Sequence, residues 1–249
     1  MTKLIEGAGV ELAVDEHGPP EGAVVLLVHG QASDARAWQP AARDLAAGGL
    51  RIVTYDRRGY GRSGAPQPYT GTTVAEQTGD AVAVLDAFAA GPAVVAGDGF
   101  GALVALDLAL RFPERVRALA CADPPLLAFV PDAAQELAAE RALLEDALRA
   151  GGPAAAVARW LEGRTDADAD TLARAQSAAR GFFADYAGLS SLAVTRAELR
   201  ALSVPAVITT GPLTPPGVVA AADALAALLP GARRDPAGDL AGAVRAVTA

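Results

Sequence analysis

Short apolar runs alternate with segments of helical periodicity along most of this chain. Short, mostly apolar runs that end at glycine or polar residues predict buried strands at residues 23–28, 50–55, 93–96, 116–122 and 206–209. The spacing of apolar residues predicts helices between them, at residues 37–47, 74–89, 103–111, 218–229 and 243–247. Residues 3–6 and 10–15 predict an antiparallel hairpin at the sheet edge. This alternation is typical of an α/β protein with a doubly wound, mostly parallel sheet.

The alternation of strands and helices stops between residues 126 and 202. Three or four helical segments follow one another there without a strand, marked by large apolar residues such as Leu144, Trp160 and Phe182. Doubly wound sheets bind their ligands at the carboxyl ends of the strands. We therefore expect residues 1–125 and 203–249 to form the core, and residues 126–202 to form a helical cap, or lid, over that end of the sheet.

A glycine-rich turn, Gly97-Asp98-Gly99-Phe100-Gly101, joins a predicted strand to a predicted helix. Small residues at positions 97 and 101 are the frame of a nucleophile elbow, a sharp strand-to-helix turn that exposes one central side chain above the sheet. A register centred on Asp98 would put the bulky Phe100 at a small-residue position. The pattern favours Gly99 as the centre, which has no side chain to expose. The alternative is an ordinary glycine-rich turn.

Composition and charge narrow the class of protein. Of the 249 residues, 52% are hydrophobic and 20% are charged, which fits a large folded domain with an insertion. The net charge of -8 makes a nucleic-acid partner unexpected. The single cysteine, Cys121, excludes an internal disulfide. The sequence shows neither a bilayer-spanning apolar run nor the apolar region of a signal peptide, so we expect a cytoplasmic protein without a membrane partner.

Three motifs resemble those of the alpha/beta-hydrolase superfamily, over residues 10–249 of this sequence. His29-Gly30 follows a buried strand, where that family has its oxyanion-hole loop. Residues 56–63 match the family's D-x-R-G-x-G-x-S turn, and residues 97–101 match its elbow, which usually reads G-H-S-x-G. Residues 111–116 are also similar to the family's return from helix to strand. The resemblance implies an alpha/beta-hydrolase fold with a helical lid, and it implies little about the reaction.

The sequence departs from this family at all three positions of the catalytic triad, which follow the order nucleophile, acid, histidine. Gly99 stands at the nucleophile position, residues 211–214 contain no carboxylate, and Asp239 stands at the histidine position. Both histidines of the chain, His17 and His29, precede the elbow. Because a serine nucleophile needs an imidazole within hydrogen-bond reach, ordinary serine hydrolysis is not expected.

The resemblance leaves two kinds of chemical group at the site. The backbone N–H groups of Gln31 and Phe100 are expected to form an oxyanion hole, because they depend only on backbone shape. Asp98, Asp123 and Asp239 occupy loops that border the same pocket, where burial would raise the pKa of a carboxyl group into the range of acid–base catalysis. Helix capping is the alternative for Asp98 and Asp239, and strand termination for Asp123. No metal or other cofactor is expected, because the spacing is not that of metal ligands.

Further residues are candidates for a substrate pocket. They are a loop histidine, the elbow glycine and six aromatic residues: His29, Gly99, Trp38, Phe129, Trp160, Phe182, Phe183 and Tyr186. Aromatic residues at helical spacing also suit an ordinary core. Our hypothesis is a non-hydrolytic enzyme that promotes cyclisation, isomerisation or elimination of a hydrophobic, oxygenated small molecule. Two alternatives are an inert ligand-binding protein and a hydrolase with Asp98 as carboxylate nucleophile.

Overall fold

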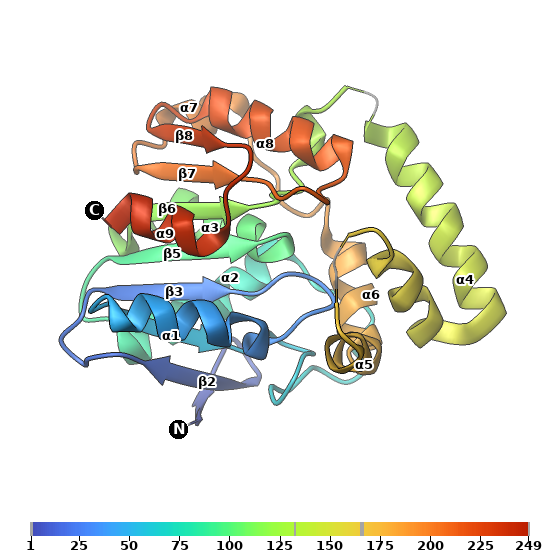
Figure 1. Cartoon of the computed structure of the whole chain (residues 1–249), viewed down its shortest axis with the longest axis horizontal. Coiled ribbons are helices and arrows are strands. Elements are labelled where there is room, and N and C mark those ends of the chain that lie inside the picture. Colours follow the sequence, from blue (N-terminus) through green and yellow to red (C-terminus); the bar gives the residue numbers. More distant parts are fainter. Residues whose placement is uncertain (1, 132, 165–166, 249) are drawn as a thin grey trace.

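An eight-stranded sheet forms the centre of the computed structural model, which describes residues 2–131, 133–164 and 167–248. The strand order is β1-β2-β4-β3-β5-β6-β7-β8 (Figure 1). β2 pairs antiparallel with both β1 and β4, and the other neighbours pair parallel. The strands are β1 (Lys3–Glu6), β2 (Glu11–His17), β3 (Val24–Val28), β4 (Arg51–Tyr55), β5 (Ala93–Asp98), β6 (Val116–Ala122), β7 (Ala206–Thr209) and β8 (Ala232–Asp235). The predicted doubly wound, mostly parallel α/β sheet is confirmed.

Helices cover both faces of this sheet (Figure 1). They are α1 (Gln39–Ala47), α2 (Val74–Phe88), α3 (Phe100–Arg111), α8 (Pro216–Leu228) and α9 (Leu240–Thr248). α1 and α9 bury one apolar cluster against the sheet, and α2, α3 and α8 bury a larger one against the opposite face. Short 3-10 helices lie at Ala35–Trp38, Pro113–Arg115 and Leu127–Phe129. Within the described part of the chain, no helix is long and apolar enough to cross a membrane.

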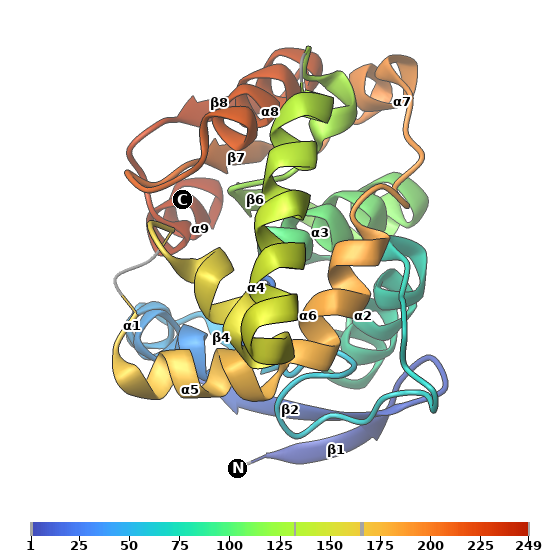
Figure 2. The same cartoon turned by 90° about the vertical axis from the view of Figure 1, so that its right-hand side faces the viewer.

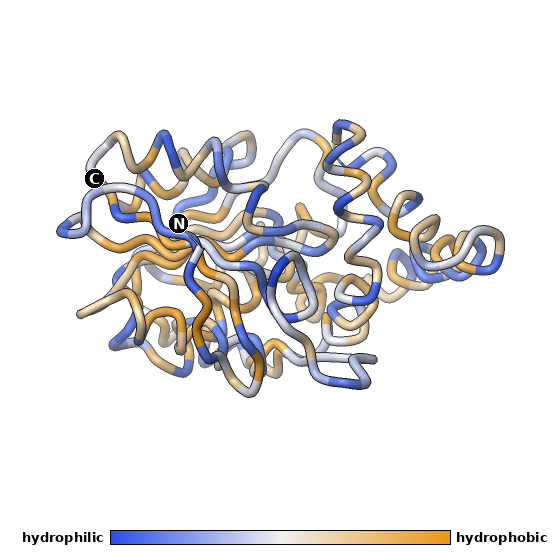
Figure 3. The backbone as a smooth tube through the Cα atoms, turned by 90° about the horizontal axis from the view of Figure 1, so that it is seen from below, coloured by the Kyte–Doolittle hydropathy of each residue, from blue (hydrophilic) through white to orange (hydrophobic). Residues whose placement is uncertain are grey.

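The inner strands have the mostly apolar sequences that two covered faces require. All but the first residue of β3 are buried, and the backbone tube is predominantly hydrophobic through the sheet (Figure 3). The sequence pattern does not predict β8, because its residues Ala232-Arg233-Arg234-Asp235 contain no apolar run. β8 is an edge strand with one paired neighbour, β7, so its side chains reach solvent.

Four helices lie between β6 and β7: α4 (Ala133–Leu161), α5 (Ala169–Ser177), α6 (Ala179–Gly188) and α7 (Arg196–Ala201). α4, α5 and α6 lie across the carboxyl ends of the parallel strands (Figures 1 and 2), and we call them the cap. α4 is interrupted at Gly152, where φ is 77° and ψ is -174°, directly before Pro153. Leu199 of α7 belongs to the core cluster, so α7 packs with the core. The division of the chain at residues 126 and 202 stays a prediction.

The turn after β4 connects the sheet to α2 through buried charges. The Asp56 carboxylate accepts hydrogen bonds at 2.9 Å from the backbone N–H groups of Ala35 and Arg62. The Arg58 guanidinium donates to the Asp80 carboxylate of α2 from Nε at 2.7 Å and from Nη2 at 2.9 Å. Both side chains are 1% exposed. Removing one member of such a pair leaves an uncompensated charge in the interior.

We expect Asp80→Ala to lower the free energy of unfolding by about 3–5 kcal/mol, because Arg58 stays buried without its main partner. Asp86→Ala on the same helix is the control, since Asp86 forms a surface ion pair with Arg115. That change should cost about 1 kcal/mol or less. Denaturant unfolding measures both effects, and equal losses in the two variants would contradict this account of the Arg58–Asp80 pair.

Candidate active site

The turn from β5 into α3 has the shape of a nucleophile elbow with Gly99 at its apex. Gly99 has a φ of 52° and a ψ of -119°. A β-carbon at Gly97 would lie 2.1 Å from the carbonyl oxygen of Gly101, and one at Gly101 would lie 2.3 Å from that of Val28. Both flanking positions therefore require glycine. A β-carbon at Gly99 would contact only the Cα of Gly30, at 3.8 Å, so the apex itself has room above it.

A cavity of 370 Å³ opens beside this turn, between the core and the cap. Its lining includes Gly30, Gln31, Asp98, Gly99, Asp123 and Thr214 from the core, and Leu137, Glu140, Trp160, Leu161 and Arg164 from the cap side. Two non-glycine residues of the described chain have positive φ, Ala32 at 50° and Asp123 at 46°, and both line this cavity. Backbone strain gathered at one cavity is a common property of functional sites.

Two backbone N–H groups without an internal partner lie next to the apex. They belong to Gln31, in the loop after β3, and to Phe100, at the first turn of α3, and neither donates a hydrogen bond to another described residue. The close approach of Gly30 to Gly99 brings the two loops together. The side-chain Nε2 of Gln31 is also buried without a partner among the described residues. This arrangement is suited to an oxyanion, which needs donors fixed in advance.

Asp98 ends β5, and its carboxyl group lies against the loop after β3. A β-carbon at Gly30 would be 2.9 Å from Oδ2 of Asp98, so glycine leaves room for the carboxylate. Protein atoms enclose the Asp98 side chain. It is nevertheless only half-buried, because it also faces the cavity. Burial raises the pKa of Asp98 to about 7, the neighbouring Asp123 adds to the increase, and Arg57 opposes it. A carboxyl group with this pKa is able to accept and return a proton near neutral pH.

Asp123 follows β6 and faces the same cavity as Asp98. Its Oδ1 accepts a hydrogen bond from Oγ1 of Thr214 at 2.6 Å and a longer one from the Gly211 N–H at 3.4 Å. These bonds fix the Asp123 carboxylate at the cavity wall. Among the described residues, no group of three or more His, Cys, Asp or Glu side chains is arranged to hold a metal ion.

His29 lies beneath the loop after β3 and is fully buried. Its Nε2 accepts a hydrogen bond from the Arg57 backbone N–H at 2.9 Å, so Nδ1 carries the proton and donates to the Gly30 carbonyl at 2.8 Å. Burial lowers the pKa of His29 well below its usual value, and Arg57 adds to this decrease. His29 therefore supports the loop as a neutral imidazole. The structure does not place this predicted pocket residue in the cavity lining.

Of the predicted pocket aromatics, the described cavity lining contains Trp160 alone. Phe182 packs edge-on against Trp160, with ring centroids 5.2 Å apart, and also contacts Phe183 and Tyr186. These three rings lie behind Trp160 because they fill the apolar centre of the cap. The positions of these three residues do not support the expected contact with a substrate.

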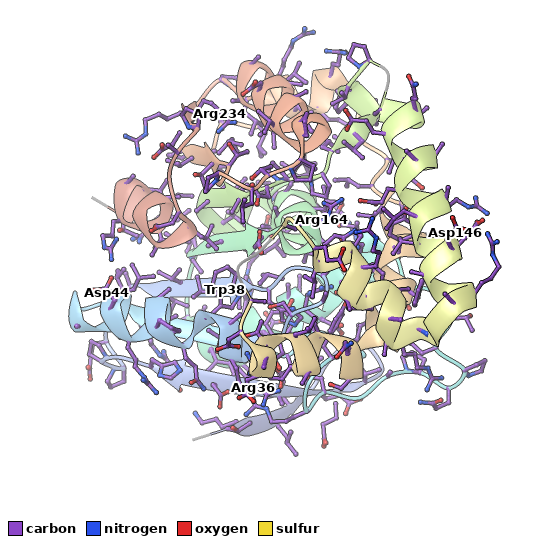
Figure 4. All side chains as sticks on the ribbon, turned by 45° about the vertical axis from the view of Figure 1, so that its right-hand side comes forward. Arg36, Trp38, Asp44, Asp146, Arg164 and Arg234 are labelled. Atoms are coloured by element: carbon purple, nitrogen blue, oxygen red, sulfur yellow. The ribbon has the colours of Figure 1, made fainter. Side chains whose placement is uncertain are left out.

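Three further predicted residues also lie outside the cavity lining. Trp38 packs at the start of α1 against the smaller core cluster (Figure 4), and Phe129 packs against the larger one. Asp239 is exposed, and its Oδ1 accepts a hydrogen bond at 2.6 Å from the Gly242 N–H, which makes it a cap for α9. The structure does not bring Asp239 to Asp98 and Asp123.

Sequence reasoning missed the charged and polar wall residues Glu140, Arg164 and Thr214. Arg164 lies among the cap elements (Figure 4), forms an ion pair with Glu140 and places its guanidinium 4.5 Å from the centre of the Trp160 ring. No motif marks these residues, because their position depends on how the cap folds back over the core. Thr214 lies three residues after Gly211. A single loop threonine gives no sequence signal of a functional role, although its side chain donates a hydrogen bond to Asp123.

The family model for the alpha/beta hydrolase fold matches residues 23–196. This chain belongs to the alpha/beta hydrolase family. Epoxide hydrolase A of Mycobacterium tuberculosis is 35% identical over 125 residues, which are 50% of this chain and 39% of the relative. Lipase LipV of the same organism is 36% identical over 115 residues, or 46% of this chain and 42% of the relative. The structure of an alpha/beta hydrolase from Sphaerobacter thermophilus is 25% identical, with a TM-score of 0.75 over 99% of this chain and 98% of that one.

These relatives correct the expected chemistry. They carry the names of hydrolases, so the expectation of a non-hydrolytic cyclase, isomerase or lyase without serine-hydrolase-type activity is wrong. The error came from equating a missing side chain at position 99 with a missing reaction, although hydrolysis also proceeds by direct attack of an activated water. The matches span less than half the length of these curated relatives, 39% and 42%. The substrates of those enzymes are therefore attributed to this alpha/beta hydrolase only as a proposal.

We expect Gly101→Ala to lower the free energy of unfolding by about 3 kcal/mol, because its β-carbon meets the Val28 carbonyl, a backbone atom that has no room to move. Gly99→Ala is the matched control. Its β-carbon enters open space, and the cost is limited to the strained backbone at φ 52° and ψ -119°, about 1–3 kcal/mol. Thermal and denaturant unfolding measure both variants. A larger loss for Gly99→Ala than for Gly101→Ala would contradict the elbow register.

Proposed function

We propose that this alpha/beta hydrolase cleaves carboxylic esters of small hydrophobic molecules by direct attack of water. Asp98 is the general base, and the N–H groups of Gln31 and Phe100 form the oxyanion hole. The observation that carries the proposal is the Asp98 carboxyl group, which faces the cavity beside the elbow and has its pKa raised to about 7.

The proposed reaction uses the space above Gly99 for the attacking water. Asp98 takes a proton from this water while its oxygen bonds to the ester carbonyl carbon. The carbonyl oxygen becomes an oxyanion, held by the two backbone N–H groups. The tetrahedral intermediate then collapses, the bond to the leaving oxygen breaks, and protonated Asp98 returns its proton to that oxygen. The products are a carboxylic acid and an alcohol, and Asp98 is again ionised.

The charge of Asp98 changes in the direction that this reaction needs. Its carboxyl group lies against Gly30, next to the oxyanion loop, so an ionised Asp98 would repel an oxyanion there. The proton that Asp98 accepts from water neutralises it as the oxyanion forms. Charge therefore moves from Asp98 to the substrate oxygen without a net increase of negative charge in the cavity.

The cavity supports a hydrophobic small molecule as the substrate. Apolar side chains of Leu127, Leu137, Leu161, Leu189 and Val218 face it, and its 370 Å³ lies within the usual range for small-molecule sites. The lipase among the relatives supports an ester, and the epoxide hydrolase makes epoxides the comparison substrate. The cytoplasmic location expected from the sequence stays a prediction.

We expect kcat/KM for p-nitrophenyl acetate to rise with pH and to reach half its plateau near pH 7. Asp98 acts as a base only when ionised, and its raised pKa keeps it protonated at lower pH. At pH 5, two units below that pKa, about 1% of the plateau should remain. Initial rates from pH 3.5 to 9 measure the profile. A half-maximum near pH 4, the range of an ordinary aspartate, would contradict the raised pKa of Asp98 on which the proposed base depends.

We expect Asp98→Asn to lower kcat by about 100-fold or more, because an amide does not accept the proton of water. Asp239→Asn is the matched control: Asp239 is exposed outside the cavity, and its loss should leave kcat within about twofold. Initial rates on p-nitrophenyl acetate measure both. A native protein without any hydrolysis of esters or epoxides would overturn the proposed function.

Isotope labelling distinguishes Asp98 as a base from Asp98 as a nucleophile. Single turnover of excess native enzyme in ¹⁸O-water should place ¹⁸O in the acid product at once if water attacks the ester directly. A carboxylate nucleophile would instead displace the alcohol and form a mixed anhydride between Asp98 and the acyl group. Attack of water on the Asp98 carbonyl of that anhydride would release an unlabelled acid in the first turnover and place ¹⁸O in Asp98. Mass spectrometry of the product and of the peptide containing Asp98 measures both. Label in Asp98 would overturn the general-base role.

A further inference from the structure

The Gly30 carbonyl, directly before the Gln31 N–H, is held by two donors. His29 Nδ1 lies 2.8 Å from the Gly30 oxygen and Arg57 Nη2 lies 2.9 Å from it. The C=O and the following N–H of a trans peptide point in opposite directions in one plane. Two bonds that fix the Gly30 carbonyl toward the interior therefore fix the Gln31 N–H toward the other side, where Gln31 lines the cavity.

Arg57 has all of its donors committed. Nε donates to the His29 carbonyl at 2.8 Å, and Nη1 donates to Oε1 of Gln77 at 2.6 Å. The Asp185 carboxylate accepts from Nη1 at 3.1 Å and from Nη2 at 2.7 Å. Together with the bond to Gly30, these interactions use the five N–H groups of a guanidinium. The position of Arg57 is therefore set by its partners, and the only charged one is Asp185.

Asp185 belongs to the cap and not to the core. It lies on α6, is 128 residues away from Arg57 in the sequence, and is fully buried. Its Oδ2 also accepts from the Tyr60 hydroxyl at 2.6 Å, and its Oδ1 from Nε2 of Gln77 at 2.8 Å. One carboxylate of the cap is thus joined through a single side chain to the loop that carries a candidate oxyanion donor.

We propose that Asp185 is a positioning residue, which orients the Gln31 oxyanion donor through Arg57. When α6 is seated, Asp185 holds the guanidinium, the guanidinium holds the Gly30 carbonyl, and the Gln31 N–H points into the cavity. The bond from a charged donor to the Gly30 carbonyl also polarises that peptide and strengthens its N–H as a donor. The inference rests on the proposed function only in using Gln31 as the oxyanion donor.

The test compares binding of a tetrahedral anion with binding of a planar neutral analogue. The probes are p-nitrophenyl methylphosphonate and 4-nitroacetanilide, titrated at pH 6, where Asp98 is mostly protonated. Asp185→Asn removes the charge and one acceptor from Arg57 without changing side-chain size. Asp80→Asn is the matched control, because it weakens the equally buried pair with Arg58, which does not touch Gly30.

We expect Asp185→Asn to weaken phosphonate binding by about tenfold, part of the effect of removing an oxyanion donor altogether. Binding of the neutral anilide should stay within about twofold, and Asp80→Asn should not change the ratio of the two affinities. A merely structural role of Asp185 would weaken both probes equally or neither, and that result would overturn the inference. Absence of phosphonate binding by the native protein would also overturn it.

Two further readouts separate the possible failures. If Asp185→Asn lacks a cooperative thermal transition, Asp185→Glu takes its place, and the same selective loss of phosphonate binding is expected. Hydrolysis of p-nitrophenyl acetate by the native protein is measured in parallel. Selective loss of phosphonate binding in a protein without hydrolysis would refute the proposed function and leave the positioning role intact. Hydrolysis with an unchanged affinity ratio would refute the positioning role alone.

Discussion

The ion pair between Arg57 and Asp185 is the interaction on which the arrangement of core and cap depends. Its side chains are 1% and 0% exposed, so both charges have lost their hydration. Such a loss is repaid only when nearly every donor and acceptor finds a partner. Arg57 meets this condition with five hydrogen bonds, and Asp185 accepts from three different side chains. A displaced α6 would carry Asp185 away and leave Arg57 without its only charged partner, which favours one position of the cap.

Apolar packing acts in the same direction as this ion pair. The cap has its own buried cluster around Phe182, and that cluster includes Ala32 from the loop after β3. Arg57 lies between the rings of Tyr60 and Phe100, at 4.8 and 5.2 Å from their centres. The strained loop backbone at Ala32 is thus covered by the cap and supported from below by a charged network. Backbone strain of this kind persists only where several surrounding interactions together hold the residue in its strained conformation.

The sequence predicts the sheet well because buried parallel strands require continuous apolar runs, and glycine at 97 and 101 is enforced by backbone contacts. It does not predict β8, whose edge position permits charged residues. The Arg57–Asp185 pair escapes prediction for a different reason: it joins residues 128 positions apart, and neither position differs locally from a surface charge. Asp239 is the opposite case, because its position is explained by a local interaction, the capping of α9, and needs no distant partner.

In the proposed function, the acid–base group lies one residue away from the elbow apex. An apex glycine supplies space and backbone direction, while the preceding Asp98 supplies a titratable group on the strand end. Histidine is the usual base because its pKa lies near neutrality without help. Asp98 reaches the same range by burial and by the nearby Asp123, whose carboxylate is held by Thr214. Two carboxylates in unequal surroundings can thus provide one base near pH 7, and in the proposed function this replaces the missing imidazole.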